Sequence, residues 1–450
     1  MSGTLGRRAV VIGAGIGGLA AAGALAPYFE QVDVIERDVL TALAASRTGT
    51  PQDRHSHGLL AGGLKALDEI YPGFSRELAH AGAVAVGMSQ DVRYERADVG
   101  VLPMRDFGIS ILCASRPLIE AVLRDRAAAV ENVVLHSECR AGAIVPSPRG
   151  DAVHGVQFET GSGVARTLDA DLVIDASGRA APTLALLDAL GRERPATSEV
   201  GVDISYATAV LDIPDDAPAW KLAITLPRPP TLALNAVLLP MEGERWIVTI
   251  VDYGAPGRLE SWDAFLDAAC RLATPTVHDA IRHARPPEGL RHYGFPASLW
   301  RHFERLPSLP RGVLPLGDSI CRFNPIYGQG MSSAARQARL LREVIGRAVA
   351  GPDPIAAVQA GFMAEIPSML SAPWGMSTSA DLAFPTTRGE RPENFEQSRQ
   401  FEAALFRAVV ADPVVHRAMV EVSQLLAPRS LLQEPHIKAR IEAVAATAVA

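Results

Sequence analysis

The fold is decided by the stretch Ala9-Val10-Val11-Ile12-Gly13-Ala14-Gly15-Ile16-Gly17-Gly18. Its first four residues are all apolar, as in a parallel strand that is buried on both faces. Gly13 permits a tight turn, Gly15 lets the backbone approach a pyrophosphate, and Gly18 lets the next helix pack close to the strand. The start of that helix would offer free N–H groups to an anion. The stretch therefore predicts a dinucleotide site in an α/β domain.

A second strand and an acid complete this unit. Residues 32–35, Val-Asp-Val-Ile, form another apolar run that ends at Glu36, and Arg37 follows. Glu36 is placed to accept hydrogen bonds from an adenosine ribose, and we expect Arg37 to contact the cofactor beside it. Strand, glycines, helix, strand and acid in this order form a far stronger signal than the glycines alone. The unit does not distinguish FAD from NAD.

A distant stretch selects FAD. Residues 312–319 read as an apolar strand that ends in Gly-Asp, and residues 324–331, Asn-Pro-Ile-Tyr-Gly-Gln-Gly-Met, precede a helix. The small Gly328 and Gly330 would let backbone lie against a flat ring, and the helix start adds a positive dipole end. Asp318 would bind a ribityl or ribose hydroxyl.

In these residues the chain resembles the flavoprotein monooxygenases of the p-hydroxybenzoate-hydroxylase superfamily, whose second FAD motif is GD…P..G.G. The resemblance implies FAD as cofactor. It also implies an α/β fold in which a Rossmann-like FAD-binding domain is interleaved with an antiparallel-sheet substrate domain and followed by a helical C-terminal part. The cofactor contacts that we expect are Gly13, Gly15, Gly18, Glu36, Arg37, Arg47, Arg116, Asp318, Pro325, Gly328, Gly330 and Met331.

The similarity extends to one branch of that superfamily. Residues 51–60, 323–331, 373–374 and 381–385 look like bacterial polyketide-tailoring flavoproteins, which include polyether alkene epoxidases and spirotetronate dialkyldecalin synthases. This implies a monooxygenase, with a role in antibiotic biosynthesis, that epoxidises or hydroxylates a large apolar polyketide-type intermediate through a flavin C4a-hydroperoxide. The cofactor then carries the chemistry, and the protein supplies binding, orientation and exclusion of water. The sequence points to no catalytic side chain.

The third motif, residues 172–179, departs from the family pattern. It has Ser177-Gly178 where aromatic hydroxylases carry Asp-Gly. The departure puts flavin reduction by NADPH or NADH in doubt; such a reductant would bind transiently, or a partner reductase would replace it. The alternative function is a non-redox cyclase that forms a decalin by a [4+2] reaction, with FAD shaping the pocket. A reductase of prenyl double bonds is a third candidate.

The domains are expected to be interleaved. The FAD-binding domain is predicted over residues 1–190 together with 308–350, with residues 86–112 contributing to the substrate domain. The substrate domain spans 191–307, and a helical region spans 351–450.

Local patterns refine this division. Trp374–Pro392 is predicted to be a long irregular loop of the kind that often forms a lid, and Glu434 to Val449 is predicted to be a final amphipathic helix. Trp220, Asn235, Trp246 and Tyr253 are candidate pocket residues in the substrate domain. Pro, Gly and Asp clusters separate four strand-like runs there, which are residues 202–213, 221–226, 231–239 and 244–253.

Composition excludes several classes of protein. The 450 residues carry a formal net charge of −7 without long runs of one sign, which argues against a nucleic-acid-binding face. The four cysteines are scattered without metal-ligand spacing, and His55 and His57 would not share a helix face, so we expect no metal site and a reduced, cytoplasmic setting. Glycines and Pro27 argue against reading the N-terminal apolar run as a signal peptide, and we expect no membrane span.

Overall fold

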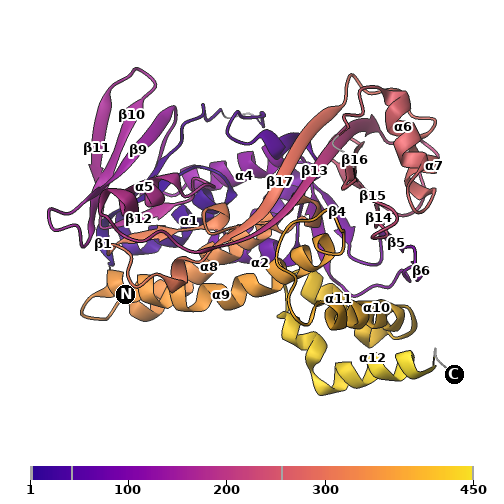
Figure 1. The fold of residues 1–450 in the computed structure, drawn as a ribbon. Coiled ribbons are helices and arrows are strands. Elements are labelled where there is room, and N and C mark those ends of the chain that lie inside the picture. Colours follow the sequence, from indigo (N-terminus) through magenta and orange to yellow (C-terminus); the bar gives the residue numbers. More distant parts are fainter. Residues whose placement is uncertain (1–3, 42–43, 255–256, 448–450) are drawn as a thin grey trace.

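In the computed structural model, which describes residues 4–41, 44–254 and 257–447, a five-stranded parallel sheet contains the strand that precedes the first glycine turn (Figure 1). The last residues of its strands lie in one row, Pro315, Asp175, Ile12, Ile35 and His136, each paired with the next. The chain segments that follow these residues therefore leave the sheet at the same edge. In sheet order the strands are β18 (Val313–Pro315), β12 (Leu172–Asp175), β1 (Gly6–Ile12), β2 (Phe29–Ile35) and β8 (Val133–His136).

Both faces of this sheet are covered, which explains the apolar runs Ala9–Ile12 of β1 and Leu172–Ile174 of β12. Val11 and Ile174 belong to the core shared with the helices, whereas Val10 and Val173 belong to the core under a three-stranded antiparallel sheet. The helices on the first face are α1 (Ile16–Leu25), α2 (Ala61–Ile70), α4 (Arg116–Ala128) and α8 (Gly330–Ala348). On the other face lie α5 (Ala181–Ala189) and strands β9 (Cys139–Pro146), β10 (Val153–Thr160) and β11 (Ala165–Asp169).

An eight-stranded sheet forms the second large layer. All its neighbouring strands are antiparallel except β14 and β5. Helices α6 (Trp262–Cys270) and α7 (Thr276–Ile281) cover one face through Phe265 and Val277. The four predicted strand-like runs correspond to β13–β16, and β13 begins five residues early. In sheet order the strands are β19 (Cys321–Arg322), β17 (Arg291–Arg301), β13 (Thr197–Asp212), β16 (Arg245–Asp252), β15 (Leu234–Met241), β14 (Leu222–Thr225), β5 (Val92–Arg96) and β6 (Gly100–Val101).

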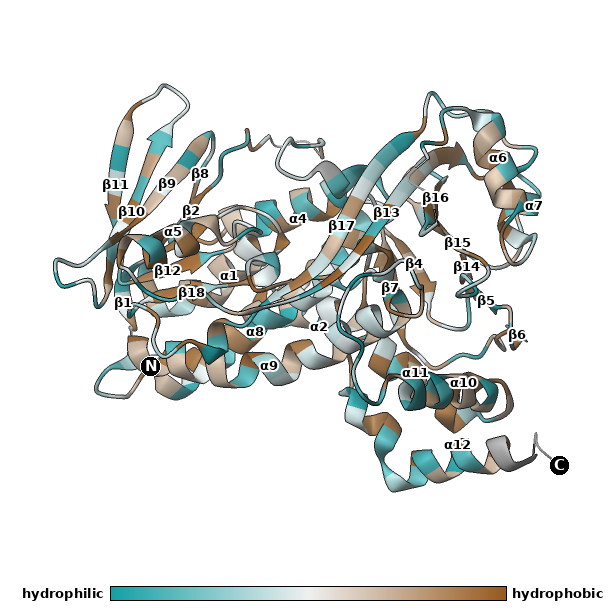
Figure 2. Cartoon of the chain, in the orientation of Figure 1, coloured by the Kyte–Doolittle hydropathy of each residue, from teal (hydrophilic) through white to brown (hydrophobic). Residues whose placement is uncertain are grey.

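A small sheet lies beside the eight-stranded one, and helices follow it. Strands β3 (Gly58–Leu59), β7 (Ser110–Cys113) and β4 (Val84–Gly87) form the small sheet in that order. The C-terminal helices are α9 (Pro354–Asp381), α10 (Phe395–Ala411), α11 (Pro413–Ser423) and α12 (Pro435–Thr447). Helix α12 is amphipathic, because Ile437 and Ile441, one turn apart, are buried beside α10 while most of its other described residues are exposed (Figure 2).

The prediction of an irregular loop over Trp374–Pro392 is wrong for its first part. Residues 374–381 form the last two turns of α9, which continues through Pro373. Proline usually breaks a helix interior, but here Pro373 is itself buried, as are Leu370 before it and Ser377 after it, and this packing holds the segment in place. Only residues after 381 are irregular up to α10.

Helix α9 is also the one described helix whose length and mean hydropathy of 1.2 would allow it to cross a membrane. Its buried residues Val358, Phe362 and Ile366 pack into the same core as α8. Its last residue, Asp381, is a fully buried carboxylate with three hydrogen-bond donors. These contacts are those of a core helix in a globular domain.

Candidate flavin site

A cavity of about 1050 Å3 opens at the edge of the parallel sheet where the strands end. Segments that are far apart in sequence meet there, because the row from Pro315 to Ile35 brings the ends of β18, β12, β1 and β2 together. Of the twelve expected cofactor contacts, Gly18 alone does not line the cavity. The eleven that do are Gly13, Gly15, Glu36, Arg37, Arg47, Arg116, Asp318, Pro325, Gly328, Gly330 and Met331.

The three glycines of the first turn have different surroundings. Gly13 has φ +101°, and a Cβ atom there would lie 2.7 Å from the carbonyl oxygen of Ala176. At Gly18, a Cβ atom would lie 1.8 Å from the carbonyl oxygen of Gly13. At Gly15, by contrast, it would meet only Arg116 Nη2, at 4.0 Å. Gly13 and Gly18 therefore allow the turn itself, and Gly15 leaves room in the cavity for a phosphate group.

Two helix N-termini reach this cavity. Helix α1 begins after Gly15 and α8 begins after Gln329, and neither has a side-chain cap from the described residues. At Gly330, a Cβ atom would have no described heavy atom within 4 Å. Uncapped N–H groups and positive dipole ends favour an anion and the electron-rich edge of a flavin, so this geometry fits FAD.

A buried carboxylate, which the sequence gave no reason to single out, holds both expected arginines. Glu120 Oε2 accepts a hydrogen bond from Arg47 Nη2 at 2.5 Å, and Glu120 Oε1 accepts one from Arg116 Nε at 2.8 Å. Burial by itself would raise the pKa of Glu120, but the charges of Arg116 and Arg47 outweigh it and lower that pKa. Glu120 therefore stays ionised and orients two cations beside Gly15.

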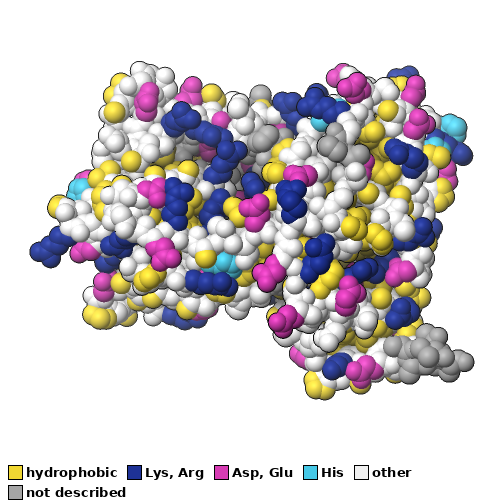
Figure 3. All heavy atoms as spheres, viewed as in Figure 1, with side chains coloured by type: hydrophobic (Ala, Val, Ile, Leu, Met, Phe, Trp, Pro, Cys, Tyr) yellow, Lys and Arg dark blue, Asp and Glu magenta, His cyan; other side chains and the backbone are white. Residues whose placement is uncertain are grey.

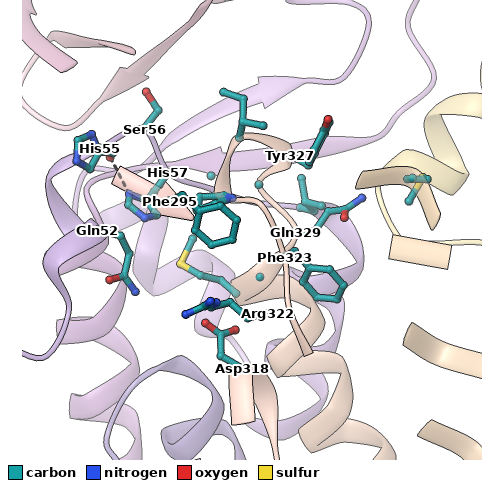
Figure 4. A pocket seen from close by; sticks show the side chains of 18 of the residues that line it. Gln52, His55, Ser56, His57, Phe295, Asp318, Arg322, Phe323, Tyr327 and Gln329 are labelled. Carbon is teal, nitrogen blue, oxygen red and sulfur yellow. Dashed lines mark hydrogen bonds between the residues drawn. The ribbon is translucent and has the colours of Figure 1, made fainter. Parts of the chain in front are cut away.

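The acids at the strand ends are arranged differently from each other. Glu36 Oε2 accepts a hydrogen bond from the Ala14 amide at 2.7 Å, so it fixes the glycine turn as well as facing the cavity. Asp318 lies in the 3-10 turn after β18, below Arg322 in Figure 4. Burial raises the pKa of Asp318, although the charges of Arg116 and Arg322 oppose this shift. Arg37 is exposed at the cavity rim.

In the third motif, residues 172–179, the carboxylate of Asp175 caps the turn that follows β12. Asp175 is fully buried, and its carboxylate accepts hydrogen bonds from the Ser177 amide at 3.1 Å and from the Thr183 hydroxyl at 2.6 Å. Ser177 and Gly178 line the cavity next to Asp318. The aspartate of this motif therefore holds the turn and the start of α5.

His57 presents a defined tautomer to the cavity. Its Nδ1 lies 2.7 Å from the carbonyl oxygen of His55, which can only accept, so Nδ1 carries the hydrogen. Burial and the neighbouring charge of Arg116 lower the pKa of His57 to about 3, which leaves Nε2 as a neutral acceptor. Figure 4 shows His57, Phe295 and Arg322 around the same space above Asp318.

His55 ends a chain of buried hydroxyl groups. Its Nδ1 is 2.7 Å from Thr208 Oγ1, which is 2.7 Å from Thr249 Oγ1, which in turn is 2.8 Å from Ser56 Oγ. Burial lowers the pKa of His55 to about 4. The two histidines serve in hydrogen bonding, and no group of metal-ligating side chains occurs in the part of the chain that the structure describes.

A second hydrogen-bond network joins the loop before α8 to the end of α9. Asp381 Oδ1 accepts hydrogen bonds from Tyr253 at 3.0 Å, Tyr327 at 2.9 Å and Asn324 at 2.9 Å, and Tyr206 donates to Asn324 at 2.6 Å. The partners come from the eight-stranded sheet, the loop before α8 and the end of α9. The sequence contains no local signal for this network, because its members are up to 175 residues apart.

The four candidate pocket residues divide into two pairs. Asn235 and Tyr253 line the cavity. Trp220 and Trp246 instead stack on each other, with ring centroids 6.2 Å apart, in the core between the sheet and α6. The two tryptophans therefore contribute to packing.

Comparison with known proteins gives a consistent picture. Residues 7–353 match the family model described as "FAD binding domain". Protein Rv3254 of Mycobacterium tuberculosis is 34% identical over 355 residues, which cover 75% of this chain and 72% of that protein. Among solved structures, the p-nitrophenol 4-monooxygenase PnpA of Pseudomonas putida DLL-E4 has a TM-score of 0.67 at 16% identity, covering 95% of this chain and 100% of PnpA. The flavin-dependent brominase Bmp2 also has 0.67, at 14% identity over 98% of both chains. These structures share the fold.

Proposed function

This chain belongs to the FAD-binding domain family, and on that premise we propose that it is a monooxygenase that epoxidises or hydroxylates a large apolar, polyketide-type intermediate. The observation that carries the proposal is the continuity of one cavity. It is lined by eleven of the twelve expected FAD contacts, and it also has walls of apolar side chains from the eight-stranded sheet and the C-terminal helices. When bound and reduced, FAD would supply the activation of O2.

The residues of the chain would bind and orient FAD and would keep water away from the reacting carbon. The start of α1 and the Glu120-held Arg47 and Arg116 would neutralise the pyrophosphate, and Glu36 and Asp318 would accept hydrogen bonds from ribose or ribityl hydroxyls. The loop at Gly328 and Gly330, fixed by Tyr327 and Asp381, would support the ring. Phe295 and Phe323 would exclude water from the reacting carbon.

We also propose that NADPH, NADH or a partner reductase supplies the electrons that reduce the flavin. On the face that Figure 3 shows, Lys and Arg side chains lie among Asp and Glu side chains (Figure 3). In the cavity lining, by contrast, arginines outnumber carboxylates ten to four. Such a positive lining would favour transient binding of NADPH or NADH, or of the acidic surface of a partner reductase.

The test uses the FAD-loaded protein with a panel of apolar alkenes. Reduction by NADPH or NADH under argon, followed by 18O2, should give a product that carries one labelled oxygen atom. A product without the label, formed while the flavin stays oxidised, would refute oxygenation.

One observation favours the second candidate, a cyclase for decalin formation by a [4+2] reaction. In the third motif, Ser177-Gly178 replaces Asp-Gly, and Asp175 is used to cap the turn. Turnover of a linear polyene in argon with fully oxidised FAD, without any reductant, would support that candidate. Loss of turnover on reduction of the flavin with dithionite would contradict it.

A further inference from the structure

A polar patch lies in the cavity lining, on one face of the eight-stranded sheet. Thr249 of β16 pairs with Val237 of β15, and Asn235, two residues before Val237, lies diagonally from Thr249 on the same face. Further along β15 and β14 the lining is apolar, with Leu239 and Ile224. Asn235 and Thr249 are thus polar side chains beside an apolar wall of the cavity.

The patch is joined across the sheet to the loop before α8. Asn235 pairs with Val251, which on its other side pairs with Tyr206, so these three residues form one row. The phenol of Tyr206 donates a hydrogen bond at 2.6 Å to Asn324 Oδ1, which belongs to that loop. The polar end of the sheet face is therefore the end near the loop that would support the flavin ring.

The amide of Asn235 has no hydrogen-bond partner among the described residues. Asn235 is only 5% exposed, and it lines the cavity. A buried amide without a partner destabilises a protein, so such a group in a cavity wall indicates a ligand that supplies the partner. Because Asn235 Oδ1 is fully buried, the NH2 group is the part of the amide that reaches the cavity.

Ser56 completes the polar patch, at the end of the hydroxyl chain that starts at His55. The chain has three hydrogen bonds, which lie between His55 Nδ1 and Thr208, between Thr208 and Thr249, and between Thr249 and Ser56. Thr208 and Thr249 are fully buried, and each hydroxyl has a single hydrogen. All three bonds can therefore form together only if they run in the same direction.

The second ring nitrogen of His55 sets that direction. His55 is neutral, because burial lowers its pKa to about 4. Its Nε2 is buried and has no partner among the described residues. A buried N–H without an acceptor is rarer than a buried acceptor without a donor, so the ring hydrogen lies on Nδ1. The bonds then run from His55 towards Ser56, which lines the cavity and keeps its own hydrogen for a group there.

The polar patch therefore offers two donors and no charge to the cavity. The Ser56 hydroxyl and the Asn235 NH2 group both need an acceptor, and a carbonyl oxygen with its two lone pairs can serve both. An ionised carboxylate would also accept, but burying a charge without a counter-ion is far more unfavourable than burying a neutral carbonyl, and the patch contains no cationic side chain. A neutral carbonyl fits these donors best.

We propose that the substrate carries a neutral carbonyl group, such as a ketone, which accepts hydrogen bonds from Ser56 and Asn235 while its apolar part lies along β14 and β15. This inference rests on the proposed function and narrows its substrate class. His55, Thr208 and Thr249 are positioning residues, because they act through the Ser56 hydroxyl. The carbonyl thereby sets which end of the substrate lies beside the loop before α8.

The test compares two probes of the same shape on the FAD-loaded protein. They are 1-tetralone and 1-methylidenetetralin, which has a CH2 group in place of the carbonyl oxygen. Equilibrium dialysis should give the ketone a Kd at least about fivefold lower than that of the hydrocarbon. The infrared C=O stretch of bound, 13C-labelled 1-tetralone should lie at lower wavenumber than in hexane, because the carbonyl accepts hydrogen bonds.

Variants locate the donors. The double variant Ser56→Ala with Asn235→Leu should bind the ketone at least about tenfold more weakly and lose the shift of the stretch, without weaker binding of the hydrocarbon. Ser56→Thr retains the hydroxyl and should keep the ketone affinity. The matched control, Ser371→Ala with Asn394→Leu, changes two exposed residues outside the cavity lining and should behave as wild type. The melting temperature of each variant checks that it is folded.

A second measurement tests the direction of the hydroxyl chain. In 15N NMR spectra of the histidine-labelled protein, the signal that is absent from His55→Gln should show the hydrogen of His55 on Nδ1. A hydrogen on Nε2 would overturn the inference, since Ser56 would then spend its own hydrogen on Thr249 and could only accept.

Equal ketone affinity in wild type and the double variant also overturns the inference, and so does a carbonyl stretch that is the same in both. Failure of the proposed function is recognised separately. A protein that shows the ketone preference but forms a product without 18O refutes the proposed function alone. A protein that inserts 18O but binds the ketone equally well in the double variant refutes this inference alone.

Discussion

The carboxylate of Asp381 accepts a hydrogen bond from the phenol of Tyr327 at 2.9 Å, across 54 residues of sequence. Tyr327 directly precedes Gly328, so the contact joins the end of α9 to the loop that would support the flavin ring. All three hydrogen bonds to Asp381 end on Oδ1, and the buried Oδ2 has no hydrogen-bond partner among the described residues. Burial raises the pKa of Asp381 to about 6.

That raised pKa gives a definite pH dependence of stability. In the unfolded chain Asp381 titrates near 3.8, so the folded state binds the extra proton between about pH 4 and 6. Its stabilising contribution is complete below pH 4 and is lost as pH rises through 6. We expect Asp381→Asn to remove this trend, which amounts to about 3 kcal/mol. Urea unfolding from pH 4 to 8 measures it, with Asp267→Asn, an exposed position, as control.

His55 should give the free energy of unfolding the opposite pH dependence. Burial lowers its pKa from 6.5 to about 4, so the unfolded state binds more protons between these values and stability falls as pH falls. His55→Gln should make that fall shallower by up to about 1.4 kcal/mol per pH unit, whereas the exposed His154→Gln should not change it. An unchanged acid slope of the unfolding free energy in His55→Gln would contradict the neutral state of this histidine.

Substitutions of Gly18 and Gly15 should have different effects, one on the stability of the fold and the other on FAD binding. Gly18→Ala places a Cβ atom against the Gly13 carbonyl and should destabilise the fold by about 3 kcal/mol or more. Gly15→Ala has room in the protein and should leave the melting temperature of the FAD-free protein within a few degrees of wild type, yet weaken FAD binding. Thermal unfolding without FAD and a separate FAD titration distinguish them. Equal destabilisation by both variants would show that Gly15 serves the fold alone.

Glu120 should be needed for both stability and cofactor binding. Glu120→Gln leaves Arg47 and Arg116 buried without their shared counter-ion, which should cost about 2–4 kcal/mol in the free energy of unfolding. We also expect weaker FAD binding, because the two guanidinium groups lose their orientation. The matched control is Glu343→Gln. Glu343 is exposed and forms an ion pair with Arg339 on α8, so its substitution should change the free energy of unfolding by less than about 1 kcal/mol. Unfolding and FAD titrations that do not separate the two variants would refute this role.

Local sequence rules predicted the fold class because the deciding signals are local. The apolar run before Gly13 and the Gly-Asp after the strand at residues 313–315 each follow from a few neighbouring residues. Their meeting at one edge follows from the geometry of parallel strands. The four strand-like runs of the substrate region were likewise delimited by Pro, Gly and Asp clusters.

The parts that were not predicted depend on distant contacts. Glu120 looked like an ordinary charged residue of a helix, and its role depends on Arg47, 73 residues away. Asp381 lay in the stretch Trp374–Pro392, which was predicted to be an irregular loop. In the structure α9 continues through Pro373 as far as Asp381, because tertiary packing overrides the local preference of proline.

The first glycine turn and the loop before α8 should bind the same FAD molecule. A fluorescence titration of the FAD-free protein measures this directly in wild type, Gly15→Val and Gly330→Val, whose substituted positions are 315 residues apart and both face open cavity. We expect one FAD per wild-type chain and a loss of affinity of at least about a hundredfold in each variant, with the melting temperature of the FAD-free protein retained. Wild-type affinity in either variant, or no FAD uptake by the wild type, would contradict it.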